Sequence, residues 1–259
     1  MLGSSQIDVD GGFVRLVDTM GDDSSIVQAA RVSYGSGTKT TREDAGLIRY
    51  LMRHRHTTPF EMCEIKLHIK CPIFIARQWL RHRTANVNEM SGRYSVIEDE
   101  FWVPSEIRSQ SGDNLQATFD VIENHGGHIH SMKMAMGASY GVYRAELEAG
   151  VCREQARAVL PQSMYTQFYW KIDLHNLLHF LRLRIDSHAQ KEIRVFAEAI
   201  ADVVREWVPV TWSAFDDYVL GAVTFSKREI AVMRGEDVRL SAGERRELAA
   251  KRKAVFGVE

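Results

Sequence analysis

The amino-acid sequence predicts a globular protein that combines β-strands with α-helices, and three observations lead to this prediction. Hydrophobic residues make up 45% of the 259 residues and charged residues 26%, which is typical of a soluble domain with a packed core. Residues 63–71 alternate between apolar and polar side chains, which is the period of a strand. The segment 191–207 repeats its apolar residues at helical spacing and is followed by Pro209.

The N-terminal part predicts one strand followed by two helices. Residues 12–18 form a short strand candidate. Asp23 or Ser24 caps a helix that runs to about Val32, and Thr41 caps a second helix. The second helix carries its apolar residues on one side, at Leu47, Ile48 and Leu51.

A single helical turn precedes the alternating strand. Thr58 to Glu61 reads Thr-Pro-Phe-Glu, a compact capping box with its cap at Thr58 and Pro at the first helical position. The strand that follows places five residues on its apolar face: Cys63, Ile65, Leu67, Ile69 and Cys71. A redox pair of these two cysteines is the alternative to core packing, but residues at the two ends of such a strand lie roughly 26 Å apart. We therefore interpret both as core residues.

The rest of the chain is predicted to be mostly helical. Pro72 starts a helix that leads into the basic residues from Arg81 onward. Residues 105–130 are polar and contain glycines, which indicates a surface excursion or a partly helical insertion. Helices follow over residues 132–147 and 153–160, and a proline stops the second of them.

A further capping box and a charged extension complete the prediction. Ser187 and Gln190 form the box before an amphipathic helix with apolar residues at Ile193, Phe196, Ile200, Val203, Val204 and Trp207. Beyond Gly221 the sequence is highly charged, and it predicts two helices of an extension, capped by Ser226/Glu229 and by Ser241/Glu244. We divide the chain into a domain, 1–220, and this C-terminal extension, 221–259. Solvated or subunit-contacting helices are a better interpretation of the extension than a nucleic-acid-binding element.

The bulk composition limits the classes of partner. The formal net charge of −1 provides no general basic field for nucleic acid. The chain has three cysteines, an odd number, and they are widely spaced, which is not the pattern of a disulfide framework. This favours a reducing compartment. We see neither a signal peptide nor an apolar run near the ~20 residues of a membrane span. The sequence therefore predicts a cytoplasmic protein that binds neither nucleic acid nor membrane.

One stretch concentrates the polar groups of a local site. Residues 81–94 read Arg-His-Arg-Thr-Ala-Asn-Val-Asn-Glu-Met-Ser-Gly-Arg-Tyr. Guanidinium groups suit phosphates because each offers several donors in one plane. With an internal Glu and a Ser-Gly pair, the stretch predicts a site for an anion of defined shape.

The histidines predict a lined cavity rather than a metal centre. His125, His128 and His130 have no cysteine or carboxylate pair nearby, and His54 and His56 flank an arginine that would repel a metal. A second set consists of His175, His179, Arg182, Arg184 and His188. An exposed polar helix face is the alternative for this set, but leucines surround these positions, and polar groups threaded through such a segment usually line a cavity.

The motifs together resemble the signature of the flavin-dependent thymidylate synthases, the ThyX family. Arg81-His82-Arg83, seven residues and Ser91 carry the signature. Four further motifs occur in the order of the family: His56-x-Thr58-Pro59-Phe60-Glu61, Ala76-Arg77-Gln78-Trp79, Ala156-Arg157-x-Val159-Leu160-Pro161 and Leu183-Arg184-x-Asp186-Ser187-His188-Ala189-Gln190. The resemblance covers roughly residues 12–212.

The resemblance implies an α+β fold, with a twisted antiparallel sheet flanked by helices. It implies a methyltransferase that converts dUMP to dTMP, with 5,10-methylenetetrahydrofolate as carbon donor and tetrahydrofolate as product. FAD is the implied cofactor and NADPH the reductant. A homotetramer with active sites between its subunits is also implied.

The matching motif positions supply the site residues, and none of them is a metal ligand. The implied dUMP contacts are Gln78, Trp79, Leu80, Arg81, Glu89, Met90, Ser91, Gly92, Arg93, Arg157 and Arg184. The implied FAD contacts are Thr58, Arg81, His82, Arg83, Glu89, Asp173, Leu174, His175 and His179. His56 and Tyr94 are candidates for the edge of the flavin or folate site. His56 could equally be a neighbour of a helix cap, and Tyr94 the start of the next strand.

The residue types fit this chemistry. Arg93 and Arg157 could hold a phosphate dianion, and a guanidinium beside N3 and its carbonyls would stabilise negative charge in a uracil ring. Arg184 is therefore the candidate catalytic residue. Ser91 is a candidate nucleophile, but no base is placed beside it, so we favour a hydrogen-bonding role. None of the cysteines lies near the arginine cluster, which supports flavin chemistry over a cysteine nucleophile.

Two segments depart from the family pattern. Asn86 stands where members often have Ser, a small polar change. Asp173-x-His175 with His179 stands where some members have Asn-x-Arg with Asn. A carboxylate would repel a flavin phosphate, so we expect Asp173 to turn away or to pair with an arginine.

Two rival functions come from other classes. The first is an RNA- or nucleotide-binding regulator, which the nearly neutral charge and the lack of stacking-aromatic motifs disfavour. The second is a metal-dependent hydrolase, for which the histidines lack ligand spacing.

Overall fold

The structure is a computed structural model that describes residues 6–32, 41–110 and 117–257. The contacts between residues divide the chain into two compact units, Met1–Trp212 and Ser213–Glu259. Every residue that the sequence assigns to the site lies in the first unit. The functional division into 1–220 and 221–259 stays a prediction.

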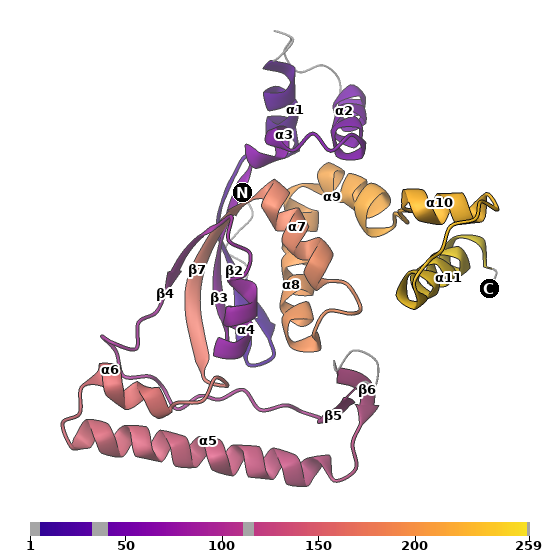
Figure 1. The fold of residues 1–259 in the computed structure, drawn as a ribbon. Helices are drawn as coiled ribbons and strands as arrows, with labels where there is room; N and C mark the ends of the chain where they lie inside the picture. The colour runs from indigo at the N-terminus through magenta and orange to yellow at the C-terminus, as the bar shows by residue number, and fades with distance from the viewer. Residues whose placement is uncertain (1–5, 33–40, 111–116, 258–259) are drawn as a thin grey trace. The chain divides into compact units, whose positions relative to one another are not determined.

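A five-stranded antiparallel sheet forms the centre of the first unit (Figure 1). In spatial order its strands are β1 (Gln6–Val9), β2 (Gly12–Met20), β3 (Glu64–Pro72), β7 (Tyr165–Asp173) and β4 (Asn86–Glu89). The predicted strand at 12–18 is confirmed within β2. The α+β fold with an antiparallel sheet and flanking helices is confirmed as well.

The predicted alternation decides which face of β3 is buried. Cys63, Ile65, Leu67, Ile69 and Cys71 are each at most 1% exposed, and both cysteines are free thiols, so their assignment to the core is confirmed. Along β7, Phe168 pairs with Ile69 and Trp170 with Leu67, and both aromatic side chains are buried. The apolar faces of the two central strands therefore form one continuous core layer.

A tight hairpin joins β1 to β2. Val9 pairs with Gly12, which leaves Asp10 and Gly11 as a two-residue loop with φ values of 46° and 77°. Two successive positive φ values match the twist of the flanking strands, and an Asp-Gly pair is a preferred sequence for such a turn.

Helices from three parts of the chain pack on the sheet (Figure 1). They are α4 (Ile73–Trp79) on β3 and β7, α7 (Leu174–Arg184) on β7, and α8 (Lys191–Trp207) on β1 and β2. The six predicted apolar residues of α8 are all buried, which confirms its amphipathic pattern. Three further helices, α1 (Asp23–Arg31), α2 (Thr41–Arg53) and α3 (Thr58–Glu61), come from the N-terminal half.

The cap of α1 differs from the prediction by one residue. Asp22, in an extended conformation, accepts hydrogen bonds from the backbone nitrogens of Ser24 and Ser25, so the assignment to Asp23 or Ser24 is wrong. Asp23 instead accepts from the backbone nitrogens of Val210 and Thr211, each at 2.9 Å. These nitrogens lie in the first turn of α9 (Pro209–Phe215), so Asp23 stabilises the start of a helix far along the chain. The side chain of Thr41, the predicted cap of α2, lies outside the described part.

Two predicted capping boxes do not form. The cap of α3 is Thr57, which is already helical and makes no side-chain cap bond, while its carbonyl accepts from Phe60 and Glu61. The chain has thus entered the turn one residue before Thr58. Gln190 precedes α8 without a side-chain cap bond either. Ser187 lies in the turn before α8, three residues ahead of the observed cap at Gln190. Its carbonyl accepts a hydrogen bond from the Arg194 side chain.

The excursion at 105–130 is more regular than predicted. It contains β5 (Arg108–Gln110), β6 (Ala117–Val121) and the start of α5 (His125–Glu148). The helix begins seven residues before the predicted Met132, because Asn124 adopts a left-handed conformation that ends the preceding segment and the first turn tolerates two glycines. The described residues contain no group of three His, Cys, Asp or Glu side chains that could hold a metal ion. The segment predicted as a helix at 153–160 is α6 (Arg153–Ala156) followed by a short 3₁₀ turn, η2 (Arg157–Val159).

The second unit contains a π-helical segment (Asp216–Leu220), α10 (Lys227–Met233) and α11 (Ala242–Phe256). Both predicted capping boxes of this unit form, at Ser226/Glu229 and at Ser241/Glu244. Among the helices of the described residues, none combines the length and the apolar character needed to cross a membrane.

Candidate active site

The signature arginines lie just beyond the C-terminal end of α4. The backbone nitrogen of His82 donates to the carbonyl of Trp79, so the chain turns as it leaves the helix. Arg81 and Arg83 are exposed, and neither guanidinium forms an ion pair with another described residue. These two guanidinium groups, separated in sequence by His82 and without an ion pair to a described residue, can therefore both approach an anion.

His82 lies between these two arginines and contacts the end of α7. Arg184 Nε donates a hydrogen bond of 3.1 Å to His82 Nε2. The imidazole also packs edge-on against Phe180, with ring centroids 4.9 Å apart, and its centroid lies 6.0 Å from that of His179. Burial, the nearby Arg184 and His179 together lower the pKa of His82 to about 4. His82 is therefore a neutral acceptor near neutral pH.

The start of α7 brings together several predicted flavin contacts. The Asp173 carboxylate caps the helix, accepting from the Asn176 backbone nitrogen at 2.9 Å and from its side-chain amide at 2.8 Å. Of the two expected alternatives, the carboxylate turns away toward its own helix and makes no described ion pair with an arginine. Leu174 is buried, and its N–H donates to the Cys63 carbonyl, so it offers a ligand little. His175 and His179 lie further along α7. His175 is half-buried and His179 is exposed.

Thr58 lies on a helix that packs against α7. It is the first residue of α3 and is exposed, and α3 packs against α7. His56, in the segment before α3, is exposed and lies next to Tyr50, with ring centroids 5.9 Å apart. The structure thus leaves both of the alternatives for His56 open.

A tight turn after β4 holds the predicted nucleotide contacts. The Ser91 hydroxyl accepts from the Arg93 backbone nitrogen at 3.3 Å, and the Ser91 carbonyl accepts from Tyr94 at 3.1 Å. Gly92 is buried, and a Cβ there would meet Ile97 Cδ1 at 2.8 Å and Arg157 Cδ at 3.3 Å. The packing therefore places the side chain of Arg157 against the turn, as the motif match predicts for two parts of one site.

Three further residues support this turn, and the sequence did not indicate them. Glu154 Oε1 lies 2.5 Å from Arg93 Nε, and Ile97 packs on Gly92. Arg153 also donates to the carbonyl of Tyr94. Glu154 lies two residues before the Ala156-Arg157 motif, and this proximity in sequence was the available signal. Tyr94 is 73% exposed and lies in the turn, so the alternative that it starts a strand is wrong.

Glu89 and Met90 are positioned by the β4–β7 pairing. The buried Thr166 donates to Glu89 Oε1 at 2.6 Å, and the Met90 backbone nitrogen donates to the Gln167 carbonyl at 2.9 Å. β4 is an edge strand, and all four of its residues are exposed. Glu89 is therefore held by one oxygen and presents the other to solvent.

The predicted contacts on α4 differ in how accessible they are. The indole of Trp79 is fully buried and packs against Phe168, Trp170 and Phe180, so only its backbone remains for a ligand. Gln78 Oε1 is buried and has no hydrogen-bond partner in the described part of the chain. Leu80 is half-buried at the end of the helix. Trp79 Nε1 is likewise buried without a described partner, but aromatic rings enclose the indole, whereas Gln78 is only partly buried and is the better candidate to meet a ligand.

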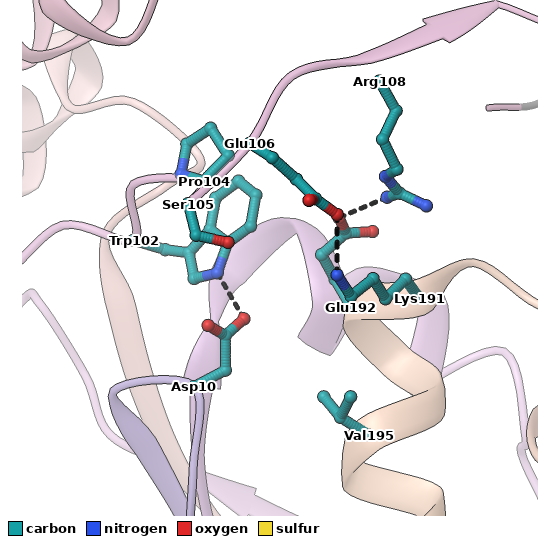
Figure 2. A pocket seen from close by; sticks show the side chains of 9 residues that line it. All are labelled: Asp10, Trp102, Pro104, Ser105, Glu106, Arg108, Lys191, Glu192 and Val195. Atoms are coloured by element: carbon teal, nitrogen blue, oxygen red, sulfur yellow. Dashed lines mark hydrogen bonds and ion pairs between the residues drawn. The ribbon is translucent and has the colours of Figure 1, made fainter. Parts of the chain in front are cut away.

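A pocket of about 210 Å³ lies elsewhere in the first unit and contains none of the predicted site residues (Figure 2). It is lined by Asp10, Trp102, Pro104, Ser105, Glu106, Arg108, Lys191, Glu192 and Val195. Both of its cations are already paired, Lys191 with Glu106 and Arg108 with Glu192. With three carboxylates and no free cation among its lining residues, this pocket is a poor site for a phosphate.

The described contacts form two separate groups. Along α7 and its cap, from Asp173 to Arg184, lie four of the nine flavin candidates together with the catalytic candidate. The turn at Ser91–Arg93, with Arg157, holds the phosphate-binding candidates. No described contact joins Arg184 to this turn, and β4 is the segment of chain between the signature arginines and the turn.

Comparison with known proteins gives consistent similarities. The family described as thymidylate synthase complementing protein matches residues 15–210. A flavin-dependent thymidylate synthase of Thermus thermophilus is 56% identical over 227 residues, covering 88% of this chain and 84% of the relative. One from Ruegeria pomeroyi is 52% identical over 244 residues, covering 91% and 80%. The solved structure of the UMP/dUMP methylase PolB from Streptomyces cacaoi, bound with 5-Br dUMP, matches with a TM-score of 0.74 at 34% identity, covering 80% of this chain and 95% of that one.

Proposed function

This chain belongs to the flavin-dependent thymidylate synthases, and from that premise we propose that it converts dUMP to dTMP. The proposed carbon donor is 5,10-methylenetetrahydrofolate, the reductant is NADPH and the cofactor is FAD. The substrate assignment draws support from the names of the relatives and from the UMP/dUMP methylase with the same fold.

One observation carries the proposal beyond the family match. The candidate activator of uracil, Arg184, is hydrogen-bonded to His82 inside the signature, although the two residues are 102 positions apart. The packing of α7 on the sheet therefore joins the group proposed for catalysis to the segment proposed for cofactor binding. Such convergence of two sequence-distant motifs is what a shared site requires.

The nucleotide phosphate would bind at the turn after β4. Arg93 and Arg157 supply guanidinium groups for a dianion. No described group accepts from the backbone N–H of Ser91 or of Gly92, so both donors remain available. The Ser91 hydroxyl already accepts a hydrogen bond within the turn, which supports a binding role rather than a nucleophilic one.

Arg184 would act on the base. A guanidinium beside N3 and its carbonyls stabilises the negative charge that makes C5 of uracil nucleophilic. Partial burial lowers the pKa of Arg184 from its ordinary value but leaves the group a cation at neutral pH. Its charge is thus available in an environment less screened than bulk water.

The residues present fit FAD. Arg81 and Arg83 are exposed and unpaired with described residues, which suits a pyrophosphate, and Asp173 is turned onto its own helix so that its charge does not oppose one. His179 would add a donor beside His82. When bound, FAD would accept hydride from NADPH and deliver reducing equivalents for the methyl group. The chain itself would bind, orient and shield the partners.

A homotetramer with sites between its subunits would complete the arrangement. The α7 group and the phosphate turn are not in described contact within one chain, so a site that needs both could combine them from different copies. Thr58 lies on α3, and His56 lies in the segment before it. Both would then border the flavin or folate. We place this enzyme in the cytoplasm.

The decisive experiment is a substrate-dependent oxidation assay on the purified protein. It should show a flavin absorbance spectrum and oxidise NADPH faster with dUMP than without it, forming dTMP when methylenetetrahydrofolate is added. UMP is assayed in parallel, because the structural relative is named a UMP/dUMP methylase. A colourless protein that cannot be loaded with FAD would refute the proposal, and turnover of UMP alone would replace dUMP as substrate.

A matched pair of variants tests the catalytic assignment. Arg184→Ala should load FAD yet lose dUMP turnover. Arg182→Ala serves as the control and should remain active, because this side chain is exposed and is not among the implied dUMP or FAD contacts. Near-normal turnover in Arg184→Ala would remove Arg184 from the mechanism.

A further inference from the structure

We propose that His82 is a positioning residue that fixes the orientation of the Arg184 guanidinium by accepting the hydrogen bond from its Nε. This inference rests on the proposed function for its effect on dUMP, but the pairing itself is a property of the chain alone. It assigns to His82 a role toward the nucleotide, in addition to its expected contact with the flavin.

The geometry leaves a defined face of Arg184 for a ligand. The guanidinium carries five N–H donors in one plane. With Nε committed to His82 at 3.1 Å, the four donors on the two terminal nitrogens remain. These form the edge that can bind two acceptors in parallel, as a carbonyl and an adjacent ring nitrogen of a uracil anion would require.

His82 is suited to this role because its own ring is held in place. Phe180 packs against it edge-on, and the short segment from Trp79 to His82 ties its backbone to the end of α4. Arg184 is the last residue of α7, where an arginine side chain without a partner would sample many rotamers. A fixed acceptor reduces the entropy that the guanidinium loses when a nucleotide binds.

The surroundings keep His82 in the accepting form. The charged and titratable groups that face it are Arg184 and His179 from α7, and Arg81 and Arg83 flank it in its own segment. Burial, Arg184 and His179 each disfavour the protonated form and so lower the pKa of His82. A protonated His82 would carry a hydrogen on Nε2 and would repel Arg184, so the pairing persists throughout the neutral range and is lost only in acid.

Two substitutions distinguish the hydrogen-bond acceptor of His82 from the packing of its ring. His82→Phe keeps an aromatic ring against Phe180 but removes the acceptor. His82→Gln places an amide oxygen near the position of Nε2 and restores it. For FAD-loaded protein, we expect His82→Phe to weaken dUMP binding by about tenfold or more, because the loss involves a hydrogen bond to a charged group. His82→Gln should stay within about threefold of the wild type.

FAD affinity is measured separately, by the change in flavin fluorescence on binding, so that a cofactor defect is not mistaken for a nucleotide defect. If both variants lose FAD affinity equally and bind dUMP alike once loaded, His82 is a flavin contact only and the proposal is overturned. If His82→Phe weakens dUMP binding and His82→Gln does not, the proposal is supported.

A double-mutant cycle tests whether His82 acts through Arg184. In an Arg184→Ala background, His82→Phe should change dUMP affinity by less than about twofold, since the residue through which it acts is gone. An undiminished tenfold effect in that background would overturn the proposal.

A ligand-free measurement distinguishes failure of this proposal from failure of the proposed function. The His82 pKa is followed by NMR in the full chain labelled at histidine. It should rise in Arg184→Ala and stay low in Arg182→Ala. If it does so while the protein shows no response to dUMP, the pairing stands and the proposed function fails. An unchanged pKa in Arg184→Ala would refute the pairing whatever the substrate.

Discussion

Arg93 Nε lies 2.5 Å from Glu154 Oε1, and this ion pair joins the turn after β4 to α6. Both side chains are about half exposed, at 52% and 54%. An exposed pair of this kind contributes at most about 1 kcal/mol to stability. Its larger effect is on ligand binding, because a phosphate that binds Arg93 must compete with the Glu154 carboxylate for the same donors.

Glu154→Gln should therefore strengthen dUMP binding. Removing the carboxylate charge frees Arg93 and removes a repulsion toward the phosphate, so we expect the dissociation constant of dUMP to fall by about threefold to tenfold, which corresponds to about 1 kcal/mol. The change is measured by titrating FAD-loaded protein with dUMP at low and at physiological salt. Glu148→Gln, which removes an exposed ion pair on α5, is the control and should have no effect. Weaker binding in Glu154→Gln would show instead that the carboxylate is needed to orient Arg93.

Gly92→Ala should impair the phosphate site while leaving the protein folded. The new Cβ would meet Ile97 Cδ1 at 2.8 Å and Arg157 Cδ at 3.3 Å, so the side chains of both must shift. We expect dUMP affinity to fall about tenfold, and overpacking to cost about 1–2 kcal/mol of stability. Both quantities are obtained from titration and urea unfolding of the same preparation.

Gly141→Ala is the matched control for this substitution. A Cβ at Gly141, within α5, meets nothing within 4 Å. Replacing a helical glycine by alanine should leave binding unchanged and raise stability by about 0.5–1 kcal/mol. Equal dUMP affinities for the two alanine variants would mean that Gly92 does not shape the site.

The elements that the sequence predicted are those specified by local pattern. The burial alternation of β3, the apolar stripe of α8 and the capping boxes at Ser226 and Ser241 each depend on neighbours a few positions away, and all four are confirmed. β4 has four residues, all exposed, and carries no apolar alternation to read, because its strand geometry comes from pairing with β7. The cap at Asp22 was displaced by one residue because Asp22 and Asp23 are both competent caps, and only the distant start of α9 decides how each is used.

The site shows the same division between motif and three-dimensional context. Motif matching identified Arg184 and His82 separately, but not the hydrogen bond between them, because no spacing rule covers a separation of 102 residues. It also could not distinguish a side-chain contact from a backbone contact. Trp79 and Leu174 match family positions, yet their side chains are fully buried in the core.

The three thiols should differ sharply in reactivity. Cys63 and Cys71 are buried on the apolar face beside and within β3, and burial raises the pKa of the Cys63 thiol to about 12 and that of Cys71 also. Cys152 is exposed. Since the thiolate is the reactive form, we expect one rapidly reacting thiol per folded chain and three after denaturation, measured with a chromogenic disulfide reagent. Cys152→Ser should abolish the fast phase, and a fast phase that survives would place a second thiol at the surface.

The helices of the C-terminal unit should depend on one buried ion pair. Glu229 on α10 is 5% exposed and accepts from Lys251 Nζ on α11 at 2.7 Å and 3.0 Å, as well as from the Ser226 backbone nitrogen. Lys251→Met would leave this carboxylate buried with its charge uncompensated. Because Lys251 is itself 30% exposed and partly screened, we expect a loss of about 2 kcal/mol rather than the full cost of breaking a fully buried pair. The measurement is hydrogen exchange of α10 and α11 in the full chain.

Lys253→Met, on the same helix at an exposed position, is the control and should leave exchange unchanged. The pH dependence supplies an independent check. The side-chain hydrogen bond from Lys251, with that from the Ser226 backbone, lowers the pKa of Glu229 to about 2 from an ordinary value of 4.5. A lowered carboxyl pKa means that the unfolded state binds the proton first, so the stabilisation is complete above about pH 4.5 and is lost as the pH falls toward 2. Protection of α10 and α11 should therefore decline in that window in the wild type and be less dependent on pH in Glu229→Gln, whereas parallel declines in both proteins would show that another group is responsible.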